Sequence, residues 1–491
     1  MKTDLLSKLK NLKHKLSKTQ LWFLGIIAVL LLINGFTIYK EMPFFPLLAI
    51  GFIFLYLVIY HVDWTMYLMA LSTPFSVIFS YQDVHLGLSV PAEPLMIMMT
   101  LLFFFHILYD WKVSNRFLLH PISIVIYIYL LWMLITSITS EIPLVSFKFL
   151  LSKIWFITSS YWMVIQLFKD DYRNAVRYFN CYAIGLAVVM LITTYRHALS
   201  GFDTHYAHWA MSPFYNDHTA YGAILAFFLP ITSCLFFLPQ NSRKQKIFYA
   251  TLTILFFIGL YLSFSRAAWI SVVLAIGVWI VLKLRIKFSW LVVGVAIVGS
   301  VFFFYADDIL YKMSRNNQDA KGNFVEHLQS MSNISTDASN VERLNRWNSA
   351  FGMIKERPLT GWGPGTYQFV YAPFQRSQYK TIITTNFGDG GNAHSEYIGP
   401  CAESGIPGML TVFALVIVSL YIGLTTYNHE KEPTRRLLCL AMTLALITYF
   451  IHGALNNFLD TDKLSLPFWG AFAMITIISS DKSIEYSINK K

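Results

Sequence analysis

The stretch Pro358-Leu-Thr-Gly-Trp-Gly-Pro-Gly365 lies in a long polar insert, Ala306 to Pro407, between two strongly apolar blocks. The apolar segments on either side are longer than the core helices of soluble proteins, and they reach the length that a helix needs to cross a bilayer. The chain around the insert is therefore expected to be embedded in a membrane, with the insert at the membrane surface.

Composition points the same way. The 491 residues are 56% hydrophobic and only 13% charged, with a mean hydropathy of +0.51, which excludes a set of ordinary soluble domains. The net charge of +11 would suggest nucleic acid as a partner of a soluble protein. Here the Lys and Arg residues lie mostly in short loops between apolar segments, where they indicate orientation. We expect a lipid bilayer as a partner, and no nucleic acid.

Apolar segments of spanning length predict an all-α polytopic fold with about fourteen transmembrane helices. The predicted spans begin near Leu21, Pro43, Trp64, Pro94, Leu118, Phe149, Ala175, Thr219, Lys246, Ala267, Ser289, Met409, Arg436 and Leu464. A Lys-rich N-terminus in the cytoplasm requires every second loop to be basic, as five loops between residues 110 and 436 are. The chain then divides into a cytoplasmic N-terminus (1–20), helices 1–11 (21–305), an extracytoplasmic catalytic loop with short amphipathic helices (306–407), helices 12–14 (408–480) and a cytoplasmic tail (481–491).

Within the insert, apolar residues recur at helical spacing from Val341 to the residues before Pro358, which predicts an amphipathic helix lying on the membrane domain. Arg343 and Arg346 occupy its first turn, on the flanks of the apolar face, so they can point toward the protein. The apolar stripe consists of Leu344, Trp347, Phe351 and Ile354.

Arg266 stands between two apolar segments with almost no loop. A guanidinium at the hydrocarbon edge is costly unless it is paired or faces water. Two interpretations remain open: a snorkelling anchor, or a clamp on a phosphate-bearing lipid head group, since planar Arg forms two parallel bonds to phosphate oxygens. Lys153, near the same predicted face, would either anchor the helix or add positive potential.

His394 precedes an apolar stretch at the same predicted face. Its role is either structural or that of a base, because an imidazole with a pKa near 6.5 can remove a hydroxyl proton at neutral pH. Glu396 and Glu403 are nearby acids, but the spacing of two residues places Glu396 off the helical face of His394. Glu403 fits either an orienting role or a helix end before the turn at 405–408.

The sequence does not predict a metal or a cofactor. His205, His208, Asp217 and His218 have metal-ligand chemistry but no fixed spacing, and Asp307-Asp308 resembles only half of a divalent site. The predicted spans hold almost no Asp, Glu or His at mid-depth, where ion-coupled transporters place them. This favours chemistry on a substrate presented at the membrane surface. A polysaccharide or small-anion transporter, and a noncatalytic component of a glycan export complex, remain the alternatives.

Five pieces of sequence resemble the O-antigen ligase and polymerase superfamily of bacterial polytopic membrane glycosyltransferases, and the region they cover runs from about residue 214 to 408. They are Phe214-Tyr-Asn-Asp-His218, Ser265-Arg-Ala-Ala-Trp269, Arg343 four residues before Trp347, Pro358-Leu-Thr-Gly-Trp-Gly-Pro-Gly365, and Ala393-His-Ser-Glu-Tyr397 followed by Glu403-Ser-Gly-Ile-Pro-Gly408. Two departures are Ser395, where the family commonly has Asn, and Pro400, which is expected to break a helix.

The resemblance implies a GT-C-like helical scaffold in the bacterial inner membrane with its active-site loop on the periplasmic face. It further implies metal-independent, inverting transfer of a glycan from an undecaprenyl-diphosphate carrier to an acceptor hydroxyl, as in the synthesis of lipopolysaccharide and other cell-envelope polysaccharides. By matching motif, Arg266 and Arg343 would bind the diphosphate and His394 would activate the hydroxyl. We expect Arg346, Lys153, His218 and Glu403 to bind substrate. The acceptor stays open among lipid A-core, another lipid-linked glycan and a protein Ser or Thr.

Overall fold

The structure is a computed structural model that describes residues 55–81, 86–109, 113–286, 338–375 and 391–480, together with residues 25, 29, 35 and 51. The chain forms two compact units, Met1–Met66 and Tyr67–Lys491. The first unit is helical at residues 55–60 and at the start of α4. The predicted N-terminus, the spans near Leu21, Pro43 and Ser289, the acids at 307–308 and the tail 481–491 lie outside the described residues.

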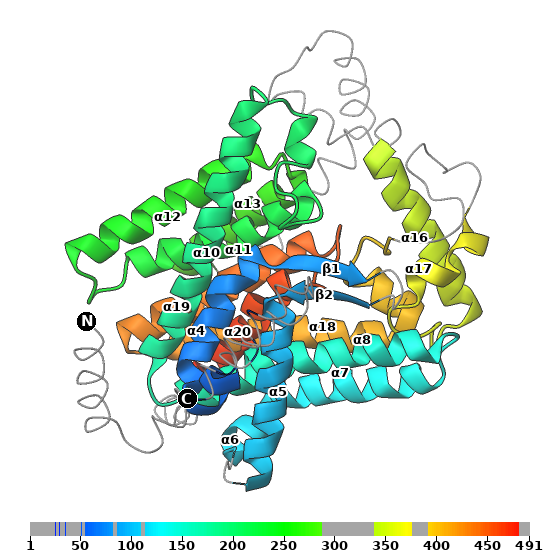
Figure 1. The fold of residues 1–491 in the computed structure, drawn as a ribbon, viewed down its shortest axis with the longest axis horizontal. Coiled ribbons are helices and arrows are strands. Elements are labelled where there is room, and N and C mark those ends of the chain that lie inside the picture. Colours follow the sequence, from blue (N-terminus) through cyan, green and yellow to red (C-terminus); the bar gives the residue numbers. More distant parts are fainter. Residues whose placement is uncertain are drawn as a thin grey trace, which may run out of the picture. The chain divides into compact units, whose positions relative to one another are not determined.

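The second unit is built almost wholly from helices (Figure 1). After α4 (Val62–Ser72), the longer helices are α5 (Ala92–Tyr109), α7 (Pro121–Ile138), α8 (Pro143–Ile157), α10 (Tyr172–Leu199), α11 (His218–Phe236), α12 (Arg243–Leu262), α13 (Arg266–Leu284), α16 (Ala338–Glu356), α18 (Ile398–His429), α19 (Pro433–His452) and α20 (Asp462–Ser479). The short ones are α6 (Asn115–Leu118), α9 (Met163–Phe168) and α17 (Tyr367–Val370), with single turns at Thr73–Phe75, Tyr206–His208 and Ala372–Phe374.

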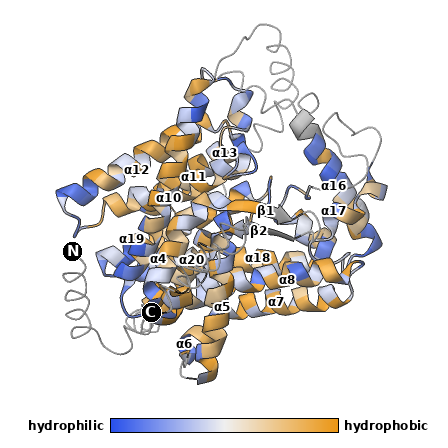
Figure 2. Ribbon diagram, viewed as in Figure 1, coloured by the Kyte–Doolittle hydropathy of each residue, from blue (hydrophilic) through white to orange (hydrophobic). Residues whose placement is uncertain are grey.

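Eight of the described helices are long and apolar enough to cross a membrane: α5, α7, α10, α11, α12, α13, α18 and α19. A helix satisfies its own backbone hydrogen bonds, which is what hydrocarbon requires of a spanning segment. Figure 2 shows hydrophobic residues along α7, α11 and α18, whereas hydrophilic residues are frequent on α16. The predicted span near Phe149 starts earlier, at Pro143, and continues through a π-turn at Thr158–Trp162 into α9.

The core of the second unit lies around α20, in which every residue from Asp462 to Ile478 is buried. Helix α20 packs against α8, α9, α10, α18 and α19, and α19 in turn packs against α11 and α13. Small residues permit close helix approach inside a membrane bundle. At Gly423 of α18, a Cβ would lie only 2.3 Å from the Oγ1 of Thr443 on α19. The bundle is therefore tightly packed at the α18–α19 contact.

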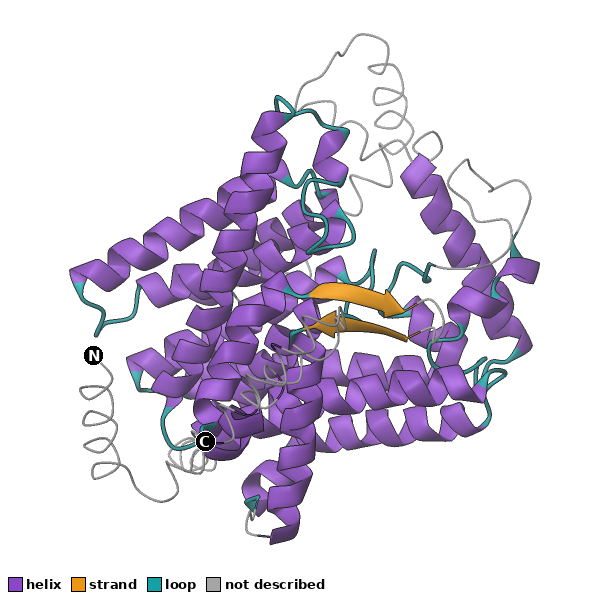
Figure 3. Cartoon of the chain, in the orientation of Figure 1, coloured by secondary structure: helices purple, strands orange, loops and turns teal. Residues whose placement is uncertain are grey.

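The one sheet among the described residues is an antiparallel hairpin, β1 (Val77–Tyr81) and β2 (Leu86–Val90), drawn in orange in Figure 3. Val77 pairs with Val90 and Tyr81 with Leu86. The hairpin is attached to α5 because the backbone N–H of Ser89 donates to Glu93 Oε2 at 2.9 Å. The sequence predicts only helices, and these two strands are a small exception to that expectation.

Helix α18 is kinked at Gly405, whose φ of 72° lies in the left-handed region. A kink frees backbone groups that need new partners. The segment 358–363 supplies them: Ile406 N donates to Pro358 O at 2.8 Å, and Gly363 N donates to Glu403 O at 2.7 Å. A Cβ at Gly361 would lie 2.4 Å from the backbone of Glu403. The segment 358–363 and the kink at Gly405 thus pack against each other, and their hydrogen bonds fix the first turns of α18.

Candidate active site

His394 lies in the segment that leads into α18. Its backbone has a φ of 49°, and its N–H donates to the Oδ1 of Asn392 at 3.0 Å. The next residue, Ser395, caps the helix, because its Oγ accepts from the N–H groups of Tyr397 at 3.2 Å and Ile398 at 3.3 Å. The sequence analysis expected Pro400 to break a helix, and this prediction is wrong. Pro400 occupies the first turn of α18, where a missing N–H costs nothing.

Glu396 ties this segment to the loop between α19 and α20. Its backbone N–H donates to Gly453 O at 2.7 Å. Its Oε1 accepts from the backbone of Phe458 at 2.9 Å, from the backbone of Leu459 at 3.0 Å, and from the hydroxyl of Tyr449. Burial raises the pKa of the Glu396 carboxyl above its ordinary value. This acid therefore holds the segment of His394 in place through the loop and does not orient the imidazole directly.

Arg266 is the first residue of α13, immediately after the turn Ser263–Ser265. That turn lies against the first turns of α11, since a Cβ at Gly222 would be 2.6 Å from the Cβ of Ser265. The contact brings Arg266 to the N-terminal end of α11. Arg266 and Arg343 both act electrostatically on His218, the first residue of α11.

The N-terminal end of α11 is capped by Asp217. Its Oδ1 accepts from the backbone N–H groups of Thr219 and Ala220, both at 2.8 Å. The imidazole rings of His208 and His218 lie 4.0 Å apart between centroids. In the described part of the chain, these residues and the other His, Cys, Asp and Glu side chains form no group of three arranged to hold a metal ion.

Helix α16 buries a different face from the one that its apolar stripe indicates. Glu342 and Arg346 are each only 5% exposed, whereas Phe351 is 49% exposed. Arg346 can be buried because its Nε donates to Glu342 Oε1 at 2.7 Å and its guanidinium lies 4.3 Å over the ring of Tyr371. The hydroxyl of Tyr367 also donates to Arg346 O at 2.7 Å. The expected position of Arg346 toward the protein is thus observed, on a buried face that also carries Ala350 and Met353.

Charged groups from several of these elements act on the imidazole of His394. Burial, then Arg343 and then Arg346 lower the pKa of His394 to about 4, against weaker opposing effects of Asp217 and Glu342. The imidazole is consequently neutral at pH 7. We call the group of Arg266, Arg343, His218, Asp217 and His394 the cation cluster; its members come from α11, α13, α16 and the segment before α18.

His452 is a neighbour of this cluster that the sequence analysis did not select. It is the last residue of α19 and is 1% exposed, and Asp217 and Arg343 both act on it electrostatically. Its Nε2 lies 3.2 Å from the side-chain amide of Asn456. The sequence did hold a signal for His452: it is a histidine at the end of an apolar segment, on the same predicted face as His394.

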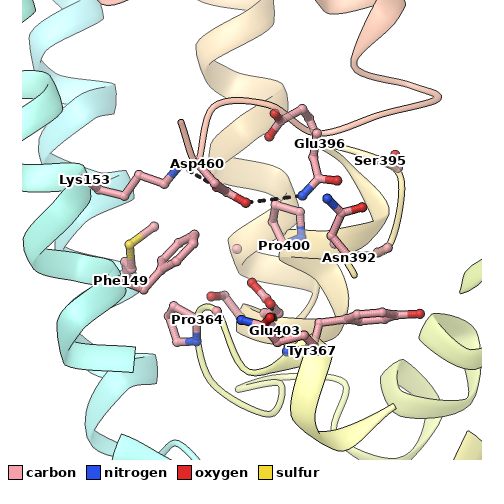
Figure 4. A pocket seen from close by; sticks show the side chains of 18 of the residues that line it. Phe149, Lys153, Pro364, Tyr367, Asn392, Ser395, Glu396, Pro400, Glu403 and Asp460 are labelled. Carbon is pink, nitrogen blue, oxygen red and sulfur yellow. Dashed lines mark hydrogen bonds and ion pairs between the residues drawn. The ribbon is translucent and has the colours of Figure 1, made fainter. Parts of the chain in front are cut away.

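A cavity of about 330 Å³ is lined in part by the segment that contains His394 (Figure 4). Asn392, Ala393, Ser395 and Glu396 line it, but His394 does not. The remaining lining residues are Tyr129, Trp132, Met133, Phe149, Lys153, Pro364, Gly365, Tyr367, Gln368, Gly391, Gly399, Pro400, Glu403, Ser404, Gly408, Thr411, Asn457 and Asp460. The cavity and the cation cluster therefore share one short segment of chain without being the same site.

Two predicted substrate-binding residues, Lys153 and Glu403, belong to the cavity and not to the cation cluster. Lys153 is 4% exposed, and its Nζ donates to Asp460 Oδ1 at 2.8 Å and to Leu459 O at 2.7 Å. Its charge is thus compensated locally, a pairing that the sequence could not reveal because Asp460 is 307 residues away. Glu403 Oε1 accepts from the backbone N–H of Tyr367 at 3.0 Å.

Spanning helices with a cluster of cations and an imidazole at one end of the bundle define a polytopic membrane protein with a site at a helix-end surface. The family model described as O-antigen ligase (Wzy_C) matches residues 250–413. This match supports the O-antigen ligase and polymerase superfamily that the motifs indicated, and together with the apolar helices it indicates a bacterial membrane protein. Arg266, Arg343, Arg346, His394 and Glu403 lie inside the matched region.

A relative from Haemophilus influenzae, described as an uncharacterized protein, is 22% identical over 243 residues. The alignment covers 49% of this chain and 59% of the relative. It therefore spans well under two thirds of the relative's length.

Proposed function

We propose that this protein is a polysaccharide ligase or polymerase of the bacterial inner membrane. It transfers a glycan from an undecaprenyl-diphosphate carrier to an acceptor hydroxyl on the extracytoplasmic face. The observation that carries the proposal is that Arg343 acts electrostatically on both His394 and His218, and that Arg266 acts on His218, at the ends of separate elements of the chain.

The donor side of the reaction needs positive charge. A diphosphate leaves readily when its developing negative charge is stabilised, and guanidinium groups do this through charge-assisted bonds to its oxygens. Arg266 and Arg343 take this role, with His218 beside them. Arg346 is held by Glu342 and Tyr371 and supports the positive potential from the buried face of α16.

The acceptor side needs a base. His394 takes the proton from the acceptor hydroxyl as the oxygen attacks the anomeric carbon and the bond from that carbon to the diphosphate oxygen breaks. A single displacement inverts the configuration at the anomeric carbon. The products are the new glycoside and the lipid diphosphate, and the proton on His394 then passes to water.

The charges at the helix ends support an extracytoplasmic position for the site. Helices that share the site have their other ends at basic positions, among them Arg243 of α12, Lys283 of α13 and Arg436 of α19. Because basic ends face the cytoplasm, the site is assigned to the opposite side.

The test is a transfer assay with the full-length protein in lipid vesicles. Each reaction contains a lipid-diphosphate glycan and one acceptor: lipid A-core, a second lipid-linked glycan, or a Ser/Thr peptide. His394→Ala should abolish product formation, by about 10²- to 10⁴-fold, because it removes the base. His429→Ala is the matched control, since His429 lies at the far end of α18 from His394 and bonds only Thr425 O among the described contacts.

Other outcomes would point to the alternatives. Wild-type transfer that survives in His394→Ala removes this residue from the mechanism. Uptake of glycan into vesicles without a covalent product would establish a transporter. In cells, retention of polysaccharide synthesis after loss of both Arg266 and His394 would establish a noncatalytic component.

A further inference from the structure

The cavity differs from the cation cluster in charge. Lys153 is the one cation among the described lining residues, and its partner Asp460 also lines the cavity, together with Glu396 and Glu403. Because its one described cation is paired with a carboxylate, the lining does not attract a diphosphate. The cavity is therefore unsuited to the donor's charged group.

The lining is suited instead to a neutral ligand with hydroxyl groups. The Oδ1 of Asn457 is buried and accepts no hydrogen bond from the part of the chain that the structure describes. A buried acceptor without a partner is costly unless a ligand or water supplies one. Asn457 Nδ2 is directed to Asp460 Oδ2 at 3.3 Å, which leaves Oδ1 for another donor.

The volume and the lining of the cavity also fit a neutral ligand with hydroxyl groups. Sites for small molecules have volumes of about 300–1,000 Å³ and combine apolar walls with a few polar groups, so a cavity of about 330 Å³ takes a sugar ring more readily than a polyprenyl chain. Trp132, Phe149 and Tyr367 provide aromatic surface, and Gln368 provides an amide.

We propose that this cavity binds the sugar of the acceptor, with Asn457 Oδ1 accepting from one of its hydroxyl groups. The segment Asn392–Glu396 is then shared by two ligands: the cation cluster, which includes His394, holds the donor diphosphate, and the cavity holds the acceptor. The inference rests on the proposed function for the role of the bound sugar, but the binding itself can be measured without transfer.

The binding experiment uses the full-length His394→Ala protein in detergent, so that no transfer occurs. Saturation-transfer NMR with the methyl glycosides of glucose, galactose and N-acetylglucosamine tests the cavity, and inorganic pyrophosphate followed by phosphorus NMR tests the cation cluster. We expect at least one glycoside to bind, and Asn457→Ala to weaken it about 2- to 12-fold, the effect of one neutral hydrogen bond. Pyrophosphate binding should not change in Asn457→Ala and should be lost in Arg266→Ala.

Two further variants make the result specific. Asn457→Ser keeps an oxygen acceptor and should restore part of the glycoside affinity. Asn174→Ala, whose side chain accepts from Arg177 near the start of α10, should bind glycosides as the parent does. Failure of every glycoside to bind, or equal affinity in Asn457→Ala and the parent, overturns the acceptor site. Glycoside binding that depends on Asn457, combined with no transfer by the wild-type protein to any acceptor, would instead uphold the site and reject the proposed function.

Discussion

The cation cluster and the cavity share one segment, Asn392–Glu396, of which His394 belongs to the cluster and the other four residues line the cavity. On one side, Arg343 and Arg346 act on a neutral imidazole; on the other, the charge of Lys153 is cancelled by Asp460. Positive residues near a predicted site therefore do not all serve the same ligand.

The largest effect that would break this comparison is expected at Arg266. Arg266→Ala should lower kcat about 10²- to 10³-fold, because it removes a donor aimed at charge that develops on the leaving group. Arg266→Lys should retain part of the rate, since it keeps the charge but loses the bidentate geometry. Arg243→Ala, at the far end of α12, is the control in the same transfer assay. Equal rates in all of these variants would favour the snorkelling anchor.

Glu396 lines the cavity and also connects the segment of His394 to the α19–α20 loop. Glu396→Ala should lower kcat by roughly 10- to 100-fold, the range for lost hydrogen bonds to a charged group, while the KM for either substrate changes little. Glu396→Gln should recover part of the rate because its amide oxygen can still accept from Phe458 and Leu459. A change in the KM for the acceptor alone, with kcat intact, would show that Glu396 binds substrate and does not position His394.

The smallest expected effect is on the pH profile. A pKa of about 4 keeps His394 neutral, and so able to act as a base, at every pH above that value. The acid limb of kcat/KM, which reports the free enzyme, should therefore fall near pH 4 and not near 6.5. Bound diphosphate opposes the field of Arg343 and Arg346, so the limb of kcat should lie at higher pH. Arg343→Gln should move the limb of kcat/KM upward, and an unchanged limb would remove Arg343 from the surroundings of His394.

Much of this arrangement follows from local sequence. Apolar length predicts the spanning helices, and the short turn before Arg266 is visible because two apolar segments meet there. Helix α16 is also predictable from its periodicity, and the structure places it at Ala338–Glu356. These features depend on residues close together in the chain.

The remaining features depend on partners that are far apart in sequence. The buried face of α16 carries Ala350 and Met353 and packs against Tyr371, whereas Phe351 of the predicted stripe is exposed. The pairing of Lys153 with Asp460 and the position of His452 result from tertiary packing of α8, α19 and α20. No pattern within one segment contains that information.

The most direct test of the division between the two sides is to measure the KM for the donor and the KM for the acceptor in Arg266→Ala and Asn457→Ala. We expect Arg266→Ala to raise the KM for the lipid-diphosphate donor and to leave the KM for the acceptor unchanged. We expect Asn457→Ala to raise the KM for the acceptor and to leave the KM for the donor unchanged. If both substitutions raise the KM for the same substrate, the separate donor and acceptor sides do not exist.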